Sequence, residues 1–214
     1  MTLEFPRYRT ALAGCLLAAS PFLAQSAAAH QAGDWLLKFG VTQVKPDSDN
    51  GSVLGGTVDL DASDNVEPSI SLTWMATRHV GIELLGALPF EHDIRSHALG
   101  GKIATTKQLP PTLSLQWHFL PTATVQPYVG VGVNYTRFFD TDTKGALSGS
   151  RLVLEDSFGL AGQVGVHVPF NEGWFINADV RYADIDTEVN LNSTRIGTAN
   201  IDPWVTTVGF GLAF

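Results

Sequence analysis

Cysteine is almost absent from the 214-residue sequence, and the one present, Cys15, lies near the amino terminus. The surrounding segment has Arg7 and Arg9, then an apolar stretch, then alanines ending at Ala29, as secretory signal peptides do. We expect cleavage after Ala29, so that residues 1–29 are removed and the exported chain has no disulfide framework. A lipoprotein signal ending at Cys15 is the weaker alternative, because too few apolar residues precede that cysteine.

Basic residues are scarce as well. The chain has 13 lysines and arginines against 21 aspartates and glutamates, a formal net charge of -8. Such acidity excludes nucleic acid from the expected partners. The exported chain also lacks any apolar run of the roughly 20 residues that a membrane helix needs. No G-x-G-x-x-G motif opens a helix, and we expect no bound cofactor.

The sequence is rich instead in large apolar residues that alternate with small or polar ones. In the last segment, Trp204 to Phe214, the large side chains share one face while smaller residues occupy the other. The small face cannot fill a core and is too uncharged for bulk water, so the pattern indicates a strand between lipid and a narrow lumen. Eight segments show this pattern: 34–46, 66–77, 79–91, 107–119, 125–139, 153–168, 173–186 and 201–214.

The connections between these segments alternate in length. Three are short, at 77–79, 120–124 and 169–172, and four are long, at 47–65, 92–106, 140–152 and 187–200. An even number of strands with short turns at one end and long loops at the other is typical of outer-membrane barrels. We therefore predict a single all-β domain over 30–214, an eight-stranded antiparallel up-and-down transmembrane β-barrel. A soluble barrel or sandwich would bury its large side chains instead.

Four segments and the carboxyl terminus resemble the OmpW family of outer-membrane proteins. The resemblance is carried by GIELLGALPFEHDI at 81–94, TKQLPPTLSLQWHF at 106–119, PYVGVGVNYTRFFD at 127–140, NADVRYADIDT at 177–187 and DPW at 202–204 before the terminal Phe214. It implies an eight-stranded barrel in the cell outer membrane, linked to the passage of small, mainly apolar molecules. Some relatives have been linked to small amino acids, so the substrate class stays open.

The resemblance also implies partners. Outer-membrane lipids and lipopolysaccharide are the expected surroundings of the barrel. The terminal Phe214 is the expected recognition signal for the barrel-assembly machinery.

Polar residues are expected on the lumen side toward the periplasm. Glu83 and Asp179 should flank Arg181 in a paired network that obstructs the lower bore, because buried charges are normally paired. The other inward polar residues at these levels are Gln116, His118, Gln163, His167 and Asn177. We interpret these side chains as filling the lumen rather than moving ions.

Toward the outside, the inward residues become apolar. We predict a vestibule that opens to the external loops and is lined by Leu85, Ala87, Pro89, Phe138, Ile185 and Val205. Small apolar solutes gain about 0.8 kcal/mol per buried CH₂ in such a space. The open alternative is a dry plug of side chains packed on one another.

Three prolines, Pro89, Pro110 and Pro111, fall near the outer ends of two strands expected to be hairpin partners. Proline has no N–H to donate to the ladder, and unpaired backbone in lipid costs several kcal/mol. We predict a local weakness there, a lateral opening through which an apolar solute leaves the vestibule for the membrane. The alternative is that the prolines end the strands harmlessly above the hydrocarbon.

The predicted function is therefore passive uptake of small, mainly hydrophobic molecules, with no enzyme activity and no metal site. Ser114 and His118 share a face near Glu83, as in a hydrolase, but positions i and i+4 of a strand are roughly 13 Å apart. The segment 47–51 lacks the distal glutamate of a calcium loop. The alternative function is a non-conducting barrel whose external loops act as a surface receptor or adhesin.

Overall fold

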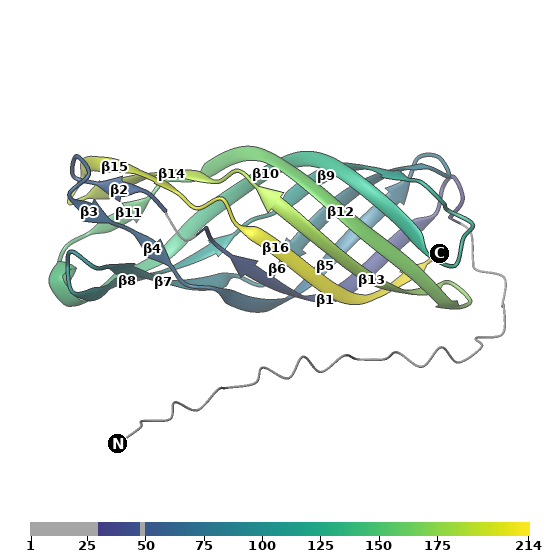
Figure 1. The fold of residues 1–214 in the computed structure, drawn as a ribbon, viewed down its shortest axis with the longest axis horizontal. Helices are drawn as coiled ribbons and strands as arrows, with labels where there is room; N and C mark the ends of the chain where they lie inside the picture. The colour runs from purple at the N-terminus through teal and green to yellow at the C-terminus, as the bar shows by residue number, and fades with distance from the viewer. Residues whose placement is uncertain (1–29, 48–49) are drawn as a thin grey trace, which may run out of the picture.

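The computed structural model describes residues 30–47 and 50–214, so the predicted signal peptide, 1–29, lies outside the described residues. Eight strands of the described chain form a closed antiparallel barrel (Figure 1). They are β1 (Trp35–Lys45), β5 (Asn65–Met75), β6 (Val80–Ala87), β9 (Thr112–His118), β10 (Gln126–Thr143), β12 (Ser157–Asn171), β13 (Trp174–Ala183) and β16 (Trp204–Ala213). Each pairs with the next in this order, and β16 pairs with β1 to close the ring. The predicted fold class is confirmed.

Large apolar side chains cover the outside of the barrel, and Phe158, for example, is 73% exposed. Buried serine, threonine, asparagine and glutamine side chains occupy the lumen face. Aromatic residues gather at two levels, because Trp35 opposes Trp74 near the periplasmic end and Tyr182 opposes Trp204 near the outer end. This is the distribution expected when lipid lies outside and a narrow lumen inside. No helix among the described residues is long and apolar enough to span a membrane.

The sheet extends beyond the outer end of the barrel. Strand β10 runs on to pair with the hairpin of β7 (Phe90–Ser96) and β8 (Gly101–Leu109), while β11 (Leu152–Leu154), β14 (Asp186–Leu191) and β15 (Thr194–Asn200) form a second sheet. The short elements there are β2 (Ser52–Val53), β3 (Val58–Asp59), β4 (Asp61–Ala62) and the 3-10 helix η1 (Gly145–Leu147). Figure 1 shows this extension at the end of the molecule opposite the carboxyl terminus. Its inner faces bury an apolar cluster that includes Ile94, Ile103 and Leu154.

The prediction of long loops was wrong at 92–106 and 187–200, where the structure has the β7–β8 and β14–β15 hairpins. In β7, Glu91 and Arg95 are exposed while His92 and Ile94 are buried. The alternation of the barrel therefore continues upward, with charged residues on the outer face because that face meets water rather than lipid. The sequence predicts a loop for 92–106, which contains Arg95, whereas Glu91 falls within the predicted strand 79–91.

Three predicted strands are interrupted. Segment 79–91 divides at Leu88–Pro89 into β6 and β7, and segment 107–119 divides at Pro110–Pro111 into β8 and β9. Segment 153–168 begins in the separate strand β11 and resumes at Ser157. The first two breaks occur where proline cannot donate a ladder hydrogen bond.

One glycine allows a large ring to cross the narrow lumen. Tyr128 of β10 pairs with Gly165 of β12, and a Cβ on Gly165 would lie 2.4 Å from Tyr128 Cζ. Without that Cβ, the Tyr128 hydroxyl reaches across to donate to Asn177 Oδ1 at 3.0 Å. The lower lumen is filled by such contacts.

Candidate functional site

Four charged side chains cross the lower lumen, and we call Lys38, Glu83, Asp179 and Arg181 the polar plug. Arg181 Nη2 donates to Glu83 Oε1 at 2.7 Å and lies 4.0 Å from Asp179 Oδ1. Lys38 Nζ pairs with the other oxygen of Glu83. All four side chains are buried. Two cations thus balance two carboxylates, as buried charges require.

The structure brings together Glu83, Asp179 and Arg181, as predicted from the sequence. Lys38 is an additional member that the prediction did not include. Lys38 lies on β1 between the outward Leu37 and Phe39, so strict alternation would have placed it in the lumen. Its ammonium group also lies 5.4 Å from the centre of the Tyr128 ring. The plug is therefore tied to the aromatic residue below it.

An apolar space lies directly above the polar plug. It leaves about 20 Å³ that the centre of a water-sized atom can occupy, room for about one water molecule, and we call it the seam pocket. Its walls include the predicted vestibule residues Leu85, Ala87, Ile185 and Val205, and Arg181 of the plug also borders it. The pocket therefore ends on charged groups toward the periplasm.

Two other predicted vestibule residues lie elsewhere. Pro89 is exposed, and the inward position is taken by Phe90, which is 1% exposed. The reason is that Leu88 and Pro89 both point outward, which shifts the alternation by one residue between β6 and β7. Phe138 is buried but borders the next space outward rather than the seam pocket.

The ladder between the third and fourth barrel strands is interrupted beside this pocket. The β6–β9 pairing ends at Leu85 and Thr112, and the β7–β8 pairing begins at Phe90 and Gln108. Between these pairs, the described residues 86–89 and 109–111 show no ladder pairing with one another. We call this interruption the seam, and it contains all three prolines that the sequence analysis selected.

Each side of the seam remains attached to its other neighbour. Leu88 N donates to Pro68 O at 3.1 Å, which holds one side to β5. Tyr135 N donates to Pro111 O at 3.0 Å, which holds the other side to β10. Pro110 borders the seam pocket directly. The interruption therefore lies between two anchored edges and faces the apolar lumen.

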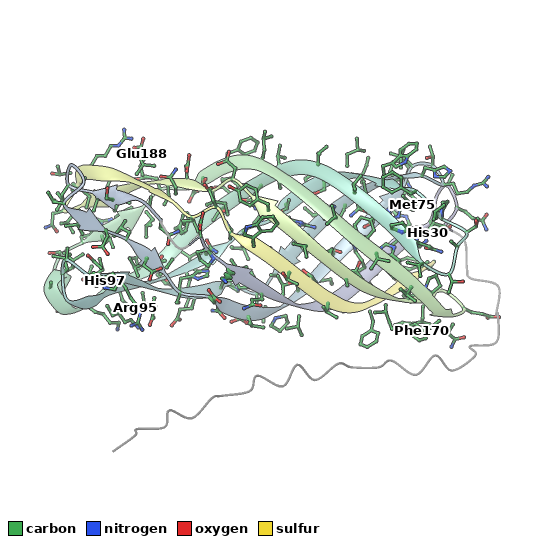
Figure 2. The ribbon with its side chains drawn as sticks, viewed as in Figure 1. His30, Met75, Arg95, His97, Phe170 and Glu188 are labelled. Carbon is green, nitrogen blue, oxygen red and sulfur yellow. The ribbon has the colours of Figure 1, made fainter. Side chains whose placement is uncertain are left out.

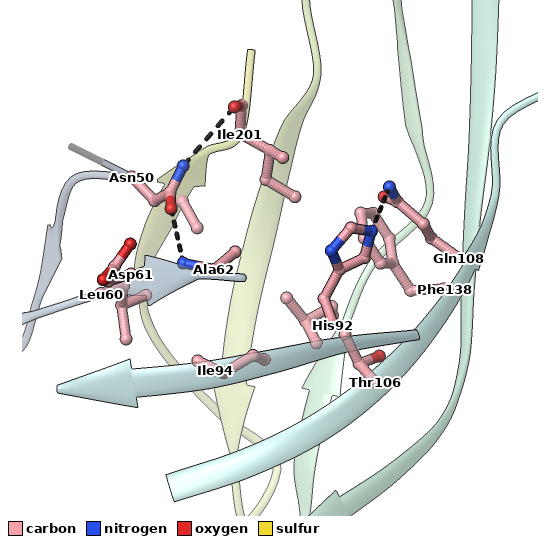
Figure 3. Close-up of a pocket in the computed structure, with 12 residues that line it drawn as sticks. Asn50, Leu60, Asp61, Ala62, His92, Ile94, Thr106, Gln108, Phe138 and Ile201 are labelled. Carbon is pink, nitrogen blue, oxygen red and sulfur yellow. Dashed lines mark hydrogen bonds between the residues drawn. The ribbon is translucent and has the colours of Figure 1, made fainter. Parts of the chain in front are cut away.

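A second space, the middle chamber, lies farther out and leaves about 30 Å³ that the centre of a water-sized atom can occupy (Figure 3). Gln108 borders both this chamber and the seam pocket. Its amide nitrogen donates to His92 Nε2 at 2.9 Å, because His92 Nδ1 carries the proton that is donated to the Ser63 carbonyl. Burial lowers the pKa of His92 below its usual range, although the Ser63 carbonyl and Asp64 act in the opposite direction. The neutral imidazole can therefore accept the bond from Gln108.

The outer chamber is the third space, at the tip of the extension, and it leaves about 30 Å³ by the same measure. Its lining is entirely apolar and includes Val58, Leu99 and Ile103. It shares Leu60, Ile94 and Leu154 with the middle chamber. The three spaces are therefore neighbours between the external tip and the seam, each sharing lining residues with the next.

Below the polar plug lies a histidine layer, made of His30, His118 and His167. One ring nitrogen from each lies within 4.8 Å of the others, and all three side chains are buried. Figure 2 labels His30 at the periplasmic end of the barrel. The sequence predicts no metal site and places His118 and His167 among the residues that fill the lumen, so it does not reveal this grouping.

A second group of possible metal ligands, Asp184, Asp186 and Asp202, lies near the outer end of the barrel. Asp202 accepts a hydrogen bond from the backbone of Ile185, and Asp186 accepts one from Asn200. Two of these three carboxylates therefore already accept hydrogen bonds from neighbouring residues.

The chain is similar to known outer-membrane proteins over most of its length. The family model described as OmpW family matches residues 31–214. Outer membrane protein W of Salmonella typhi is 43% identical over 205 residues, covering 92% of this chain and 96% of its own length. The crystal structure of the outer membrane protein OprG from Pseudomonas aeruginosa has a TM-score of 0.77 and 34% identity, covering 87% of this chain and 98% of that one.

A more distant relative is the dibenzothiophene metabolism operon protein PahQ of Pseudomonas aeruginosa. It is 25% identical over 191 residues, covering 84% of this chain and 88% of its own length. Relatives named as outer-membrane proteins, with the same barrel in solved structures, confirm the predicted location in the outer membrane.

Proposed function

The chain belongs to the OmpW family of outer-membrane proteins, and we propose that it carries small, mainly hydrophobic molecules passively from outside the cell into the outer membrane. The route enters at the outer chamber, passes the middle chamber and the His92–Gln108 pair, and reaches the seam pocket. It leaves sideways through the seam that contains Pro89, Pro110 and Pro111. No covalent step is needed along this route.

The observation that carries the proposal is the position of the seam. The interruption between residues 86–89 and 109–111 lies beside the last apolar space above the polar plug. A solute that moved straight on would have to separate the ion pairs of Glu83 with Lys38 and Arg181. Separating a buried pair is costly, because each charge is left without its partner in a medium of low dielectric. The sideways exit avoids that cost.

Such a route favours both the entry of an apolar solute into the chambers and its release into lipid. An apolar solute gains about 0.8 kcal/mol per CH₂ group when it leaves water for the chambers. It then passes from one apolar environment to another when it enters lipid, so the lumen does not trap it. A transport path needs sites favourable enough to enter and weak enough to leave. The apolar side chains that line the outer chamber and part of the seam pocket support this proposal.

The names of relatives support a hydrophobic substrate class. PahQ is described as a protein of a dibenzothiophene metabolism operon. Dibenzothiophene is a flat apolar heterocycle. We extend this substrate class, small apolar molecules, to the present chain.

The proposal is tested by uptake of N-phenyl-1-naphthylamine, an apolar dye whose fluorescence rises in lipid, into intact cells that express the barrel. Intact cells are needed because lipopolysaccharide supplies the polar barrier that apolar solutes cross slowly. Leu85→Arg and Ile185→Arg place a charge in the seam pocket, and each should slow uptake toward the rate of cells without the barrel. Leu120→Arg, at an exposed residue of a periplasmic turn, should leave the rate unchanged.

Folding of each variant is checked by its heat-dependent mobility on electrophoresis. If folded Leu85→Arg and Ile185→Arg variants take up the dye as fast as the wild type, the route through the seam pocket is wrong. If the wild type itself gives no uptake above cells without the barrel, the receptor or adhesin alternative replaces the proposal.

A further inference from the structure

The histidine layer joins three segments that are far apart in the sequence. His118 ends β9, His167 lies in β12, and His30 lies in the segment before β1. The ring centres of His30 lie 5.5 Å from His118 and 5.3 Å from His167, and His118 lies 5.5 Å from His167. Their exposed fractions are 2% for His30 and 0% for the other two. Three imidazoles therefore meet in a space closed to bulk water.

Several nitrogens of this layer lack the partners that buried polar atoms normally have. His30 Nδ1, His118 Nδ1 and His167 Nε2 have no hydrogen-bond partner among the residues that the structure describes. Most buried polar side-chain atoms in proteins are hydrogen-bonded, so a cluster of unpaired ones calls for an explanation. A bound cation is one, since an unprotonated imidazole nitrogen is an electron-pair donor.

A hydrogen bond to Gln116 determines which nitrogen of His118 could bind a cation. His118 Nε2 lies 3.2 Å from Gln116 Oε1, which can only accept a hydrogen bond, so the proton of a neutral His118 is on Nε2. The unpaired nitrogen, Nδ1, is then the one with a free electron pair. Metal-binding histidines typically have their other nitrogen fixed by a second-shell partner in this way.

The donor set selects the class of ion. Zn–N distances of about 2.0–2.1 Å place the nitrogens of a tetrahedral site roughly 3.3 Å apart. One nitrogen of each ring lies within 4.8 Å of the others, so small side-chain movements would bring three donors to that spacing. Imidazole suits zinc and copper, whereas calcium and magnesium prefer oxygen ligands. The nearby ammonium of Lys38 would oppose a cation, but its pairing with Glu83 offsets that charge.

We propose that His30, His118 and His167 form a site for a transition-metal ion of the zinc or copper class at the periplasmic end of the lumen. If cleavage follows Ala29, the α-amino nitrogen of His30 is available as a fourth donor. The ion would tie the segment before β1 to β9 and β12 and would close the lumen below the polar plug. This inference is independent of the proposed uptake route.

The test uses untagged protein purified from membranes in detergent and treated with a chelator, because an engineered histidine tag would itself bind metal. Zn²⁺ binding is measured by calorimetry and by metal analysis after desalting. We expect one ion per barrel, with affinity lowered about tenfold or more in His118→Gln and in His167→Gln, since even second-shell losses have such effects. His79→Gln and His97→Gln, which alter histidines outside the layer, should bind as the wild type does.

A second measurement on the wild type does not depend on variant folding. Cu²⁺ bound at this site should give an electron paramagnetic resonance spectrum with hyperfine splitting from several equivalent nitrogens. Substoichiometric Zn²⁺, or a copper spectrum without nitrogen splitting, would overturn the proposal. So would full retention of Zn²⁺ by a folded double variant, His118→Gln with His167→Gln, because that result means adventitious binding elsewhere.

Discussion

Arg181 Nη2 lies 2.7 Å from Glu83 Oε1 and so joins β13 to β6, two strands that are not neighbours in the barrel. The contact crosses the lumen rather than running along the wall. Glu83 is held from its other side by Lys38 of β1. Charge pairing between three strands therefore crosses the lower lumen, and Arg181 of this network borders the apolar space above it.

The plug should contribute to stability as a buried ion network does. Arg181→Met removes a cation from a buried cluster and leaves Asp179 and part of Glu83 unpaired, so unfolding free energy should fall by about 3–5 kcal/mol. Arg195→Met is the matched control, because Arg195 pairs with Glu188 at an exposed site and such pairs contribute about 0–1 kcal/mol. Urea unfolding in lipid vesicles, followed by tryptophan fluorescence, measures both. Equal losses in the two variants would contradict a buried plug.

The β7–β8 hairpin should become less stable at acidic pH because of His92. Burial lowers the pKa of His92 in the folded protein, whereas the unfolded residue has a pKa of about 6.5. Below pH 6.5 the unfolded segment binds a proton that the folded one resists, so stability falls as pH falls through that value and is level above it. Exchange of the Gln108 backbone amide, measured relative to its intrinsic rate at each pH, should therefore become faster between pH 7 and pH 5.

His92→Gln is the control for this pH effect. Asp93 stays charged over the same window, because its hydrogen bond to Lys102 lowers its pKa. Exchange in the His92→Gln variant, corrected for intrinsic rates, should therefore be independent of pH between 7 and 5. A wild-type hairpin whose corrected exchange is also flat would rule out the role of His92.

Phe214 should matter for assembly in cells more than for stability. Its side chain is 65% exposed, while its backbone N–H and C=O both pair with Trp35. Phe214→Ala keeps those backbone bonds and should refold in detergent like the wild type, yet yield less folded barrel in membranes if the assembly machinery reads the ring. Phe210→Ala, with 57% exposure, is the control. Equal membrane yields of the two variants would argue against recognition of Phe214.

The barrel itself could be predicted from the sequence because the alternation of apolar and small residues is a local property. Each strand meets lipid on one side and a narrow lumen on the other, and the residue types report this directly. Above the lipid the outer face becomes charged, as at Glu91 and Arg95, so the sequence predicts a loop for β7 from His92 onward. For the same reason the sequence does not show that the inward–outward alternation shifts by one residue at Leu88 and Pro89, which places Phe90 in the lumen.

The candidate sites were predicted only where alternation alone suffices. Glu83 and Arg181 are inward on their own strands, and so is Lys38, which the same pattern would have given. The grouping of His30 with His118 and His167 depends on how three segments align across the lumen. The sequence of a single segment does not predict that alignment. The chambers likewise depend on packing of the external extension, which local pattern does not reveal.

Closure of the seam is the most direct test of lateral release. The triple variant Pro89→Ala, Pro110→Ala and Pro111→Ala restores three N–H donors, which should allow β6 and β7 to pair continuously with β8 and β9. Pro127→Ala, within the paired β10 and β12 ladder, is the control. Slow amide exchange at positions 89, 110 and 111 would verify that the seam has closed. The measurement is then dye uptake by intact cells: the account predicts a rate close to that of cells without the barrel, and wild-type uptake through a closed seam would contradict it.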